Sequence, residues 1–196
     1  MAVVAASLAV VAVLVAVARR VAGKRKVSIM ANTFGRIFRH LSYPGWRVSR
    51  AFPKAALKAI EAEIGRSENT HDGELRFVVV GGLDVSRLWR GVSARQHAVE
   101  VFSQLRVWDT EHNSGVLIYV QLADRQVEIL ADRGIHRKAG DATWQTICAG
   151  MQNSFRTGKF EQGAVDGVQA VSRVLVEHFP AHRDNPDELS NDVVLM

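Results

Sequence analysis

The sequence predicts an α/β domain with a small mixed β-sheet flanked by helices, and three observations support this fold class. Residues 116–122 are almost continuously apolar and β-branched or aromatic, which is typical of a central strand buried on both faces. Residues 126–131 alternate, which indicates a half-buried strand. The polar link 123–125 between them has turn chemistry, so the two strands should form an antiparallel hairpin.

Earlier elements give the first part of the predicted order α-β-α-β-β-α-α. Apolar residues recur at helical spacing between residues 52 and 64, which predicts a first helix. Residues 74–80 read as the first strand, and a capping box at residues 93–96 begins the second helix. A strand, a helix and a second buried strand in this order predict a right-handed crossover with parallel strands.

Two further helices complete the predicted domain, which spans residues 47–180. The first holds Trp144, Cys148, Met151 and Phe155 on one stripe, so Cys148 is expected to be an inert buried thiol rather than a nucleophile. The second runs over residues 160–179 and stops before a proline. The polar residues 181–196 are predicted to be a disordered tail.

Basic residues are concentrated near the start of the chain. Residues 1–54 contain ten Lys and Arg and no Asp or Glu, whereas the remainder contains 15 basic and 20 acidic residues. The positive charge therefore belongs to the arm and not to the folded domain. Since no DNA- or RNA-binding module is recognisable, we predict no nucleic acid partner.

Residues 1–29 allow three interpretations. Residues 2–18 are an apolar run broken only by Ser7, and basic residues follow, so the run could anchor the protein in a membrane with its domain in the cytoplasm. It could instead be a cleaved signal peptide. Alternatively, Met30 is the true start, residues 1–29 are a mis-assigned extension, and the protein is soluble in the cytoplasm.

Residues 30–46 are predicted to be a basic amphipathic linker. Phe34, Ile37, Phe38 and Leu41 recur at helical spacing, with basic residues on the other flank. Such a helix suits the surface of an anionic membrane. Equally, it could be a linker helix packed on the domain.

The loops at one end of the predicted sheet collect polar residues. A hairpin brings residues 109–113 and 132–136 to the same end, and the crossover adds residues 71–74. Carboxylates there could bind Ca²⁺ or Mg²⁺, and histidines would shift the preference toward Zn²⁺ or Mn²⁺. The candidate metal ligands are Asp109, Glu111, His112, Asp132 and His136, with Asp72 as a further possibility.

Asn113 and Arg133 are candidate phosphate- or ligand-binding residues at the same end. In a phosphatase, the metal would polarise the phosphoryl oxygens, Arg133 would clamp the phosphate and a histidine would act as general acid. The alternative is a solvated set of loops, in which Asp109 caps a turn, Asn113 takes an unusual backbone angle and Arg133 pairs with a nearby carboxylate.

Three stretches resemble a known family: VWDTEHNSGVL at residues 107–117, VEILADRGI at 127–135, and the glycine-containing residues 155–163. They are similar to the TPM domain, which occurs in thylakoid-lumen acid phosphatases, photosystem II repair proteins and a receptor auxiliary subunit. The resemblance covers residues 47–179 and is strongest to a small bacterial branch. It implies an α/β sandwich and, in some members, calcium binding or weak acid phosphatase activity at the loop end of the sheet.

These observations predict a membrane-associated protein with a single TPM-type domain. It would act as an interaction or assembly module for a membrane protein partner. A metal site at the loop end of the sheet is a further possibility. The alternative is a metal-dependent acid phosphatase, and whether the protein is an enzyme stays open. The sequence contains no Walker loop, dinucleotide fingerprint, HExxH zinc helix or GxSxG elbow.

Overall fold

The main elements follow the predicted order, with short additions. A computed structural model describes residues 34–182 and 189–196, and residues 34–41 are helical. The elements after them are α3 (Gly45–Ala51), α4 (Lys54–Glu68), β1 (Leu75–Val80), α5 (Val85–Trp89), α6 (Ala94–Gln104), β2 (Val116–Gln121), β3 (Gln126–Ala131), α7 (Arg133–Ala139), α8 (Asp141–Arg156), α9 (Phe160–His178) and β4 (Val194–Leu195).

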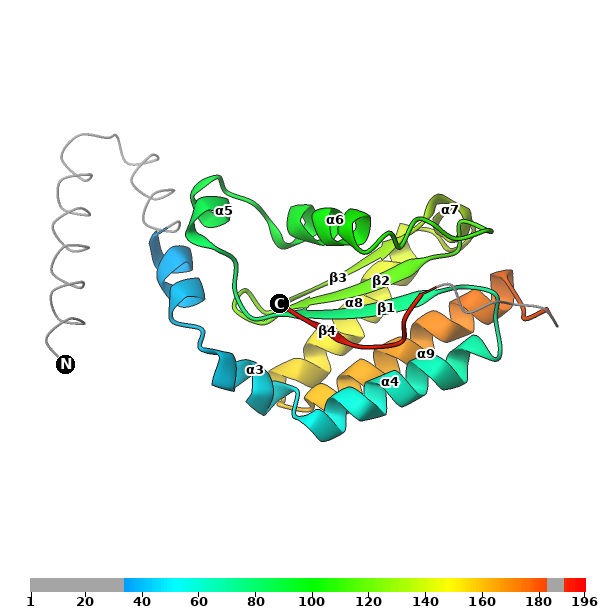
Figure 1. The fold of residues 1–196 in the computed structure, drawn as a ribbon, viewed down its shortest axis with the longest axis horizontal. Helices are drawn as coiled ribbons and strands as arrows, with labels where there is room; N and C mark the ends of the chain where they lie inside the picture. Colours follow the sequence, from blue (N-terminus) through cyan, green and yellow to red (C-terminus); the bar gives the residue numbers. More distant parts are fainter. Residues whose placement is uncertain (1–33, 183–188) are drawn as a thin grey trace, which may run out of the picture.

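The sheet is mixed and has the strand order β3-β2-β1-β4 (Figure 1). β2 and β3 pair antiparallel, with Val116 opposite Ala131 and Gln121 opposite Gln126. β1 and β2 pair parallel across the crossover that contains α5 and α6. The predicted hairpin and the predicted parallel pair are therefore both confirmed.

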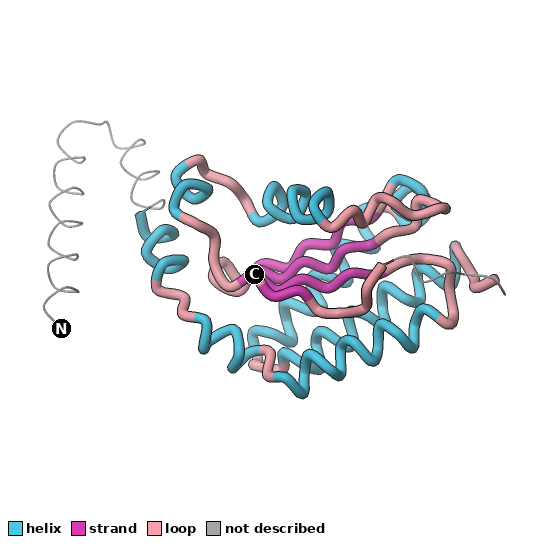
Figure 2. The backbone as a smooth tube through the Cα atoms, viewed as in Figure 1, coloured by secondary structure: helices cyan, strands magenta, loops and turns pink. Residues whose placement is uncertain are grey.

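Helices cover both faces of the sheet, as Figures 1 and 2 show. α4, α8 and α9 pack on one face, where Ile60 and Val168 join Phe77 and Ile118 in the larger core. α6 packs on the other face against a second core. Every residue of β1 and β2 is buried, which explains why both strands are apolar except for Arg76 and Gln121.

α8 places the single cysteine of the chain beside the larger core. Burial raises the pKa of the Cys148 thiol to about 11, so the thiol is neutral near neutral pH. A neutral, partly buried thiol is a poor nucleophile, in agreement with the packing role that the apolar stripe of this helix indicates.

Three short helices, α3, α5 and α7, were not among the predicted elements. α5 has only five residues, too few to show a helical period, and the Asp84 side chain caps it by accepting a hydrogen bond from the Arg87 N–H. α7 occupies part of the stretch interpreted as a loop, and Asp132 caps its first residue. A single capping residue with a short following helix gives only a weak sequence signal.

The tail differs from its prediction. Instead of being disordered, Val194–Leu195 forms β4 and pairs parallel with Val78 and Val79 of β1. Backbone bonds continue past β4, since the Met196 N–H donates to Val79 O at 2.9 Å and the Gly81 N–H donates to Met196 O at 2.9 Å. An edge strand held by backbone hydrogen bonds needs no apolar periodicity, so no sequence pattern predicted β4. Residues 183–188 lie outside the described residues.

The interpretations of residues 1–29 also lie outside the described part of the chain, which begins at Phe34. Among the helices of residues 34–182 and 189–196, none combines the length and the apolar character needed to cross a bilayer.

Candidate functional site

The loops at the predicted end of the sheet meet through their backbones. The Ile135 N–H donates to Asn113 O at 3.2 Å, and the Asp132 N–H donates to Gly115 O at 2.8 Å. The entry loop of β1 joins them, because the Ser114 hydroxyl donates to Asp72 O at 3.1 Å. The topology thus brings together the three segments that the hairpin and crossover predicted.

Gly134 allows the segment after β3 to approach the loop before β2 closely. A Cβ on Gly134 would lie 2.5 Å from Asn113 O and 2.7 Å from His112 O, so only hydrogen fits there. Asn113 has a φ of 52°, a left-handed conformation that asparagine tolerates better than most residues. The two loops are therefore packed against each other at backbone distance.

The two aspartates of these loops already have structural partners. Asp109 forms an ion pair with Arg106 at 2.8 Å, and both side chains are largely exposed. Asp132 is only 6% exposed, and its Oδ1 accepts the Arg133 N–H at 2.6 Å as the cap of α7. Within the described residues, Asp132 Oδ2 is buried without a hydrogen-bond donor.

The remaining predicted residues of this end are at the surface. Glu111, His112, Asn113 and Arg133 are exposed. His136 Nε2 lies 3.7 Å from Asp141 Oδ1, across the junction between α7 and α8.

Asp72 has a partner that sequence reasoning missed. Its carboxylate accepts the His182 N–H at 2.8 Å and also contacts the His182 ring. Burial raises the pKa of Asp72, but the hydrogen bonds from His182 outweigh burial, so the pKa stays below its ordinary value. His182 lies in the segment predicted to be a disordered tail, and no periodic signal marked it.

Within the described residues, the predicted metal ligands of this end do not gather into one group. In the part of the chain that the structure describes, no three His, Cys, Asp or Glu side chains form a group able to hold a metal ion. Ca²⁺ takes six to eight oxygen ligands and Mg²⁺ about six, whereas the buried carboxylates Asp72 and Asp132 already accept hydrogen bonds from His182 and from the first residue of α7. The prediction of Ca²⁺ or Mg²⁺ at Asp109, Glu111, His112, Asp132 and His136 remains a prediction.

At the opposite end of the sheet, the helix of residues 34–41 is fastened to the hairpin turn. Asp124 accepts a hydrogen bond from Arg36 Nε at 2.8 Å, and His40 Nε2 lies 2.9 Å from the other oxygen of this carboxylate. The Leu83 N–H donates to His40 Nδ1 at 2.9 Å. His40 is buried, so this helix packs on the domain, as one of the two interpretations of the linker expected.

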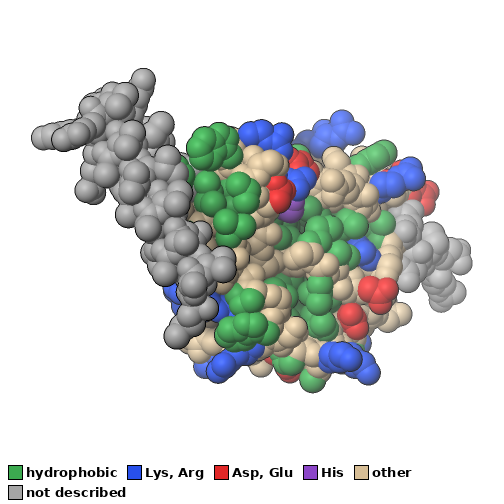
Figure 3. Space-filling model, turned by 60° about the vertical axis from the view of Figure 1, so that its left-hand side comes forward, with side chains coloured by type: hydrophobic (Ala, Val, Ile, Leu, Met, Phe, Trp, Pro, Cys, Tyr) green, Lys and Arg blue, Asp and Glu red, His purple; other side chains and the backbone are tan. Residues whose placement is uncertain are grey.

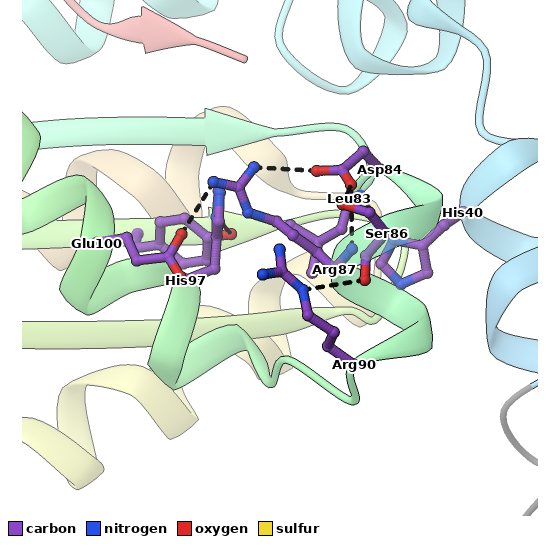
Figure 4. A network of polar contacts seen from close by, with 9 residues as sticks. His40, Leu83, Asp84, Ser86, Arg87, Arg90, His97 and Glu100 are labelled. Atoms are coloured by element: carbon purple, nitrogen blue, oxygen red, sulfur yellow. Dashed lines mark hydrogen bonds and ion pairs between the residues drawn. The ribbon is translucent and has the colours of Figure 1, made fainter.

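A polar network holds α5 against α6 (Figure 4). The Arg87 guanidinium donates to Asp84 at 3.0 Å and to Glu100 of α6 at 2.9 Å. Hydrogen bonds from the Ser86 hydroxyl and the Arg87 N–H hold the pKa of Asp84 well below its usual range. These contacts fix the start of α5, whose last residue is Trp89.

Large apolar side chains point to solvent around this end. Phe38 is 59% exposed, Leu41 65%, Trp46 60% and Trp89 67%. Residues 34–41, α3 and α5 lie together at one side of the molecule in Figure 1, and Phe34 contacts the Trp89 ring edge-on at 6.0 Å. Figure 3 turns this side forward and shows hydrophobic side chains on it, together with both basic and acidic side chains.

We call this surface the apolar–arginine face. It consists of the exposed residues Phe38, Arg39, Leu41, Trp46, Arg47, Arg50 and Trp89. The sequence signal for its first part was the amphipathic spacing of residues 34–41. Trp46 and Trp89 were missed because an isolated tryptophan is more often a core residue.

Comparisons with known proteins agree with the fold. The family model described as TPM domain matches residues 49–174. The NMR structure of the BA42 protein from the psychrophilic bacterium Bizionia argentinensis is similar at 31% identity and a TM-score of 0.65, covering 72% of this chain and 93% of that one.

A second solved structure is the N-terminal domain of a protein from P. gingivalis. It is similar in fold at 21% identity and a TM-score of 0.54, covering 66% of this chain and 82% of that one. The comparison with curated proteins finds no match.

Proposed function

We propose that this chain, which belongs to the TPM domain family, is an interaction module that binds an anionic membrane surface through its apolar–arginine face. The observation that carries the proposal is the exposure of Phe38, Leu41 and Trp46 within a segment that has arginines and no acidic residue. Large contiguous apolar surfaces on soluble domains mark interaction sites.

The chemistry of this face matches the boundary between lipid headgroups and acyl chains. Burying a large apolar side chain gains about 1.5–3 kcal/mol. An arginine near an anionic leaflet adds about 1 kcal/mol. Tryptophan prefers this boundary because its ring is apolar and its N–H is polar.

Rigid attachment makes the face suitable for docking. Arg36 and His40 tie the helix of residues 34–41 to Asp124, while Phe38 and Leu41 stay on its solvent side. The face is therefore already ordered before it meets a membrane, which lowers the entropy lost on binding.

Tryptophan quenching tests the proposal on the full chain. With vesicles of phosphatidylcholine and brominated phosphatidylglycerol, the double variant Trp46→Phe, Trp89→Phe is expected to lose most of the bromine-dependent quenching. Phenylalanine keeps the face apolar, so binding itself should persist. Because bromine quenches only nearby rings, this measurement identifies the face that touches lipid, whatever else attaches the protein to the vesicle.

Trp108→Phe is the matched control, since Trp108 is 47% exposed on the loop after α6, at the other end of the domain. Its removal should leave the quenching of the remaining tryptophans unchanged. Equal quenching in the double variant and in this control would contradict the proposal.

The alternative function, a metal-dependent acid phosphatase, can be tested separately. Because the loop-end carboxylates serve as a cap and an ion-pair partner, we expect Ca²⁺ or Mg²⁺ to leave the unfolding temperature unchanged. We also expect no release of phosphate from p-nitrophenyl phosphate. Metal-dependent release that disappears in both Asp109→Ala and Asp132→Ala would instead establish the phosphatase.

A further inference from the structure

A cavity of about 680 Å³ lies at the turn end of the β2–β3 hairpin. Its walls come from α3, from the hairpin turn and from the junction between α8 and α9. This is the end of the sheet opposite to the loops that carry the predicted metal ligands. A volume of this size is typical of small-molecule sites.

Four arginines line the cavity, and no acidic residue does. Arg47 and Arg50 come from α3, Arg125 from the hairpin turn and Arg156 from the last turn of α8. We call this cavity the arginine pocket. The chain positions are up to about a hundred residues apart, so the fold itself gathers the four charges.

These charges are not neutralised by the surrounding protein. Among residues 34–182 and 189–196, none of the four arginines forms an ion pair. Arg156 donates to the Asn153 side chain at 2.6 Å, and the Arg47 guanidinium lies over the Trp46 ring at 5.5 Å. Like charges that share a cavity repel one another, and an anion would relieve the repulsion.

Two of these arginines affect the pKa of the same residue, Tyr43. Its pKa is raised by burial, and the positive charges of Arg47 and Arg125 oppose this rise. Arg47 also lies over the Tyr43 ring at 5.7 Å. Arg47 and Arg125, which belong to different elements, thus both line the pocket together with Tyr43.

Aromatic rings supply an apolar wall beside the arginines. Phe155 and Phe160 line the pocket and stack at 5.3 Å, and Phe52 of the core meets both edge-on. Tyr43 and Trp46 line the pocket near α3. A ligand that fills this space should have an anionic group next to an apolar part.

We propose that the arginine pocket binds the phosphate group of an ester that also has an apolar portion. Guanidinium groups bind phosphate oxygens in a bidentate manner, and each remains charged at any physiological pH. The apolar portion would lie on the aromatic wall. The phosphate could come from a lipid headgroup or from a soluble ester, and a soluble ester would not require the membrane contact proposed above.

Hexyl phosphate is a suitable probe for the full chain, with binding measured by titration calorimetry. Arg125→Gln and Arg156→Gln are each expected to weaken its binding about tenfold. Both side chains are exposed, so the variants should keep their fold, which thermal unfolding checks. Neither residue belongs to the apolar–arginine face, so this test is distinct from the quenching test.

Arg137→Gln is the matched control, because Arg137 is an exposed arginine on α7, away from the pocket. It makes the same change of net charge and should leave binding unchanged. Arg156→Lys should also weaken binding, since lysine keeps the charge but not the bidentate geometry. Inorganic phosphate should bind more weakly than hexyl phosphate because it cannot use the aromatic wall.

Vesicles of phosphatidylcholine with phosphatidic acid distinguish the two phosphate sources. Weaker vesicle binding by both pocket variants would support a lipid headgroup, whereas weaker binding of hexyl phosphate alone would support a soluble ester. Three results would overturn the proposal: no binding of hexyl phosphate at millimolar concentration, equal losses in Arg137→Gln and the pocket variants, or equal binding of inorganic and hexyl phosphate.

Discussion

Gly115→Ala is expected to lower the free energy of unfolding by about 3 kcal/mol. Gly115 is buried just before β2, and a Cβ there would overlap the Val107 carbonyl oxygen and lie 3.0 Å from its carbonyl carbon. The Gly115 carbonyl also accepts the Asp132 N–H at 2.8 Å. Relieving the overlap must move backbone on at least one side, and this movement would disturb the cap of α7. Chemical denaturation followed by circular dichroism measures the loss.

Gly150→Ala provides the control for this substitution. Gly150 is an exposed residue inside α8, and a Cβ there would meet nothing within 4 Å. Alanine favours helix over glycine by about 1 kcal/mol, so this variant should be at least as stable as the wild type. If Gly115→Ala also left the free energy of unfolding unchanged, the loop end would have space for a Cβ that the structure excludes. The close packing of these loops would then be wrong, and a ligand could fit there.

Asp124→Ala is expected to cost about 2 kcal/mol, with the loss concentrated in residues 34–41. The Asp124 carboxylate lies 2.8 Å from Arg36 Nη2 and 2.9 Å from His40 Nε2. Its removal leaves the partly buried Arg36 without its acceptor and the buried His40 ring without the carboxylate beside it. Hydrogen exchange should therefore accelerate in residues 34–41, while the amides of β1 and β2 remain protected.

Asp109→Ala is the control for Asp124→Ala. It removes a carboxylate whose one ion pair is as short as that of Asp124 but is exposed to solvent. Asp109 lies 2.8 Å from Arg106, and its side chain is half exposed. Exposed pairs contribute at most about 1 kcal/mol and often nothing measurable, so little change is expected. Equal losses in the two variants would show that the Asp124 cluster does not anchor the helix of residues 34–41.

The strands were predictable because the burial of a strand determines the pattern of apolar residues along it. β2 could be recognised from its apolar run, and β3 from its alternation, without any knowledge of their partners. The pairing followed from the short turn between them. Chain order then gave the parallel position of β1, so the fold class required no long-range information.

The roles of the polar residues were harder to predict because a carboxylate looks the same in every role. Asp132 reads as a possible metal ligand until a helix is known to start at Arg133, and then it is a cap. Asp124 reads as a turn residue, yet its partner Arg36 is 88 positions away. The arginine pocket also depends on α3 meeting the hairpin turn, which no local pattern encodes.

The short strand β4 affects how the domain behaves in a crowded solution. β1 is valine-rich, and without β4 its outer side would present unpaired N–H and C=O groups. Such an open edge templates pairing with a second copy of the same strand, which begins aggregation. Val194 and Leu195 pair with Val78 and Val79, so we expect β4 to hinder this self-association.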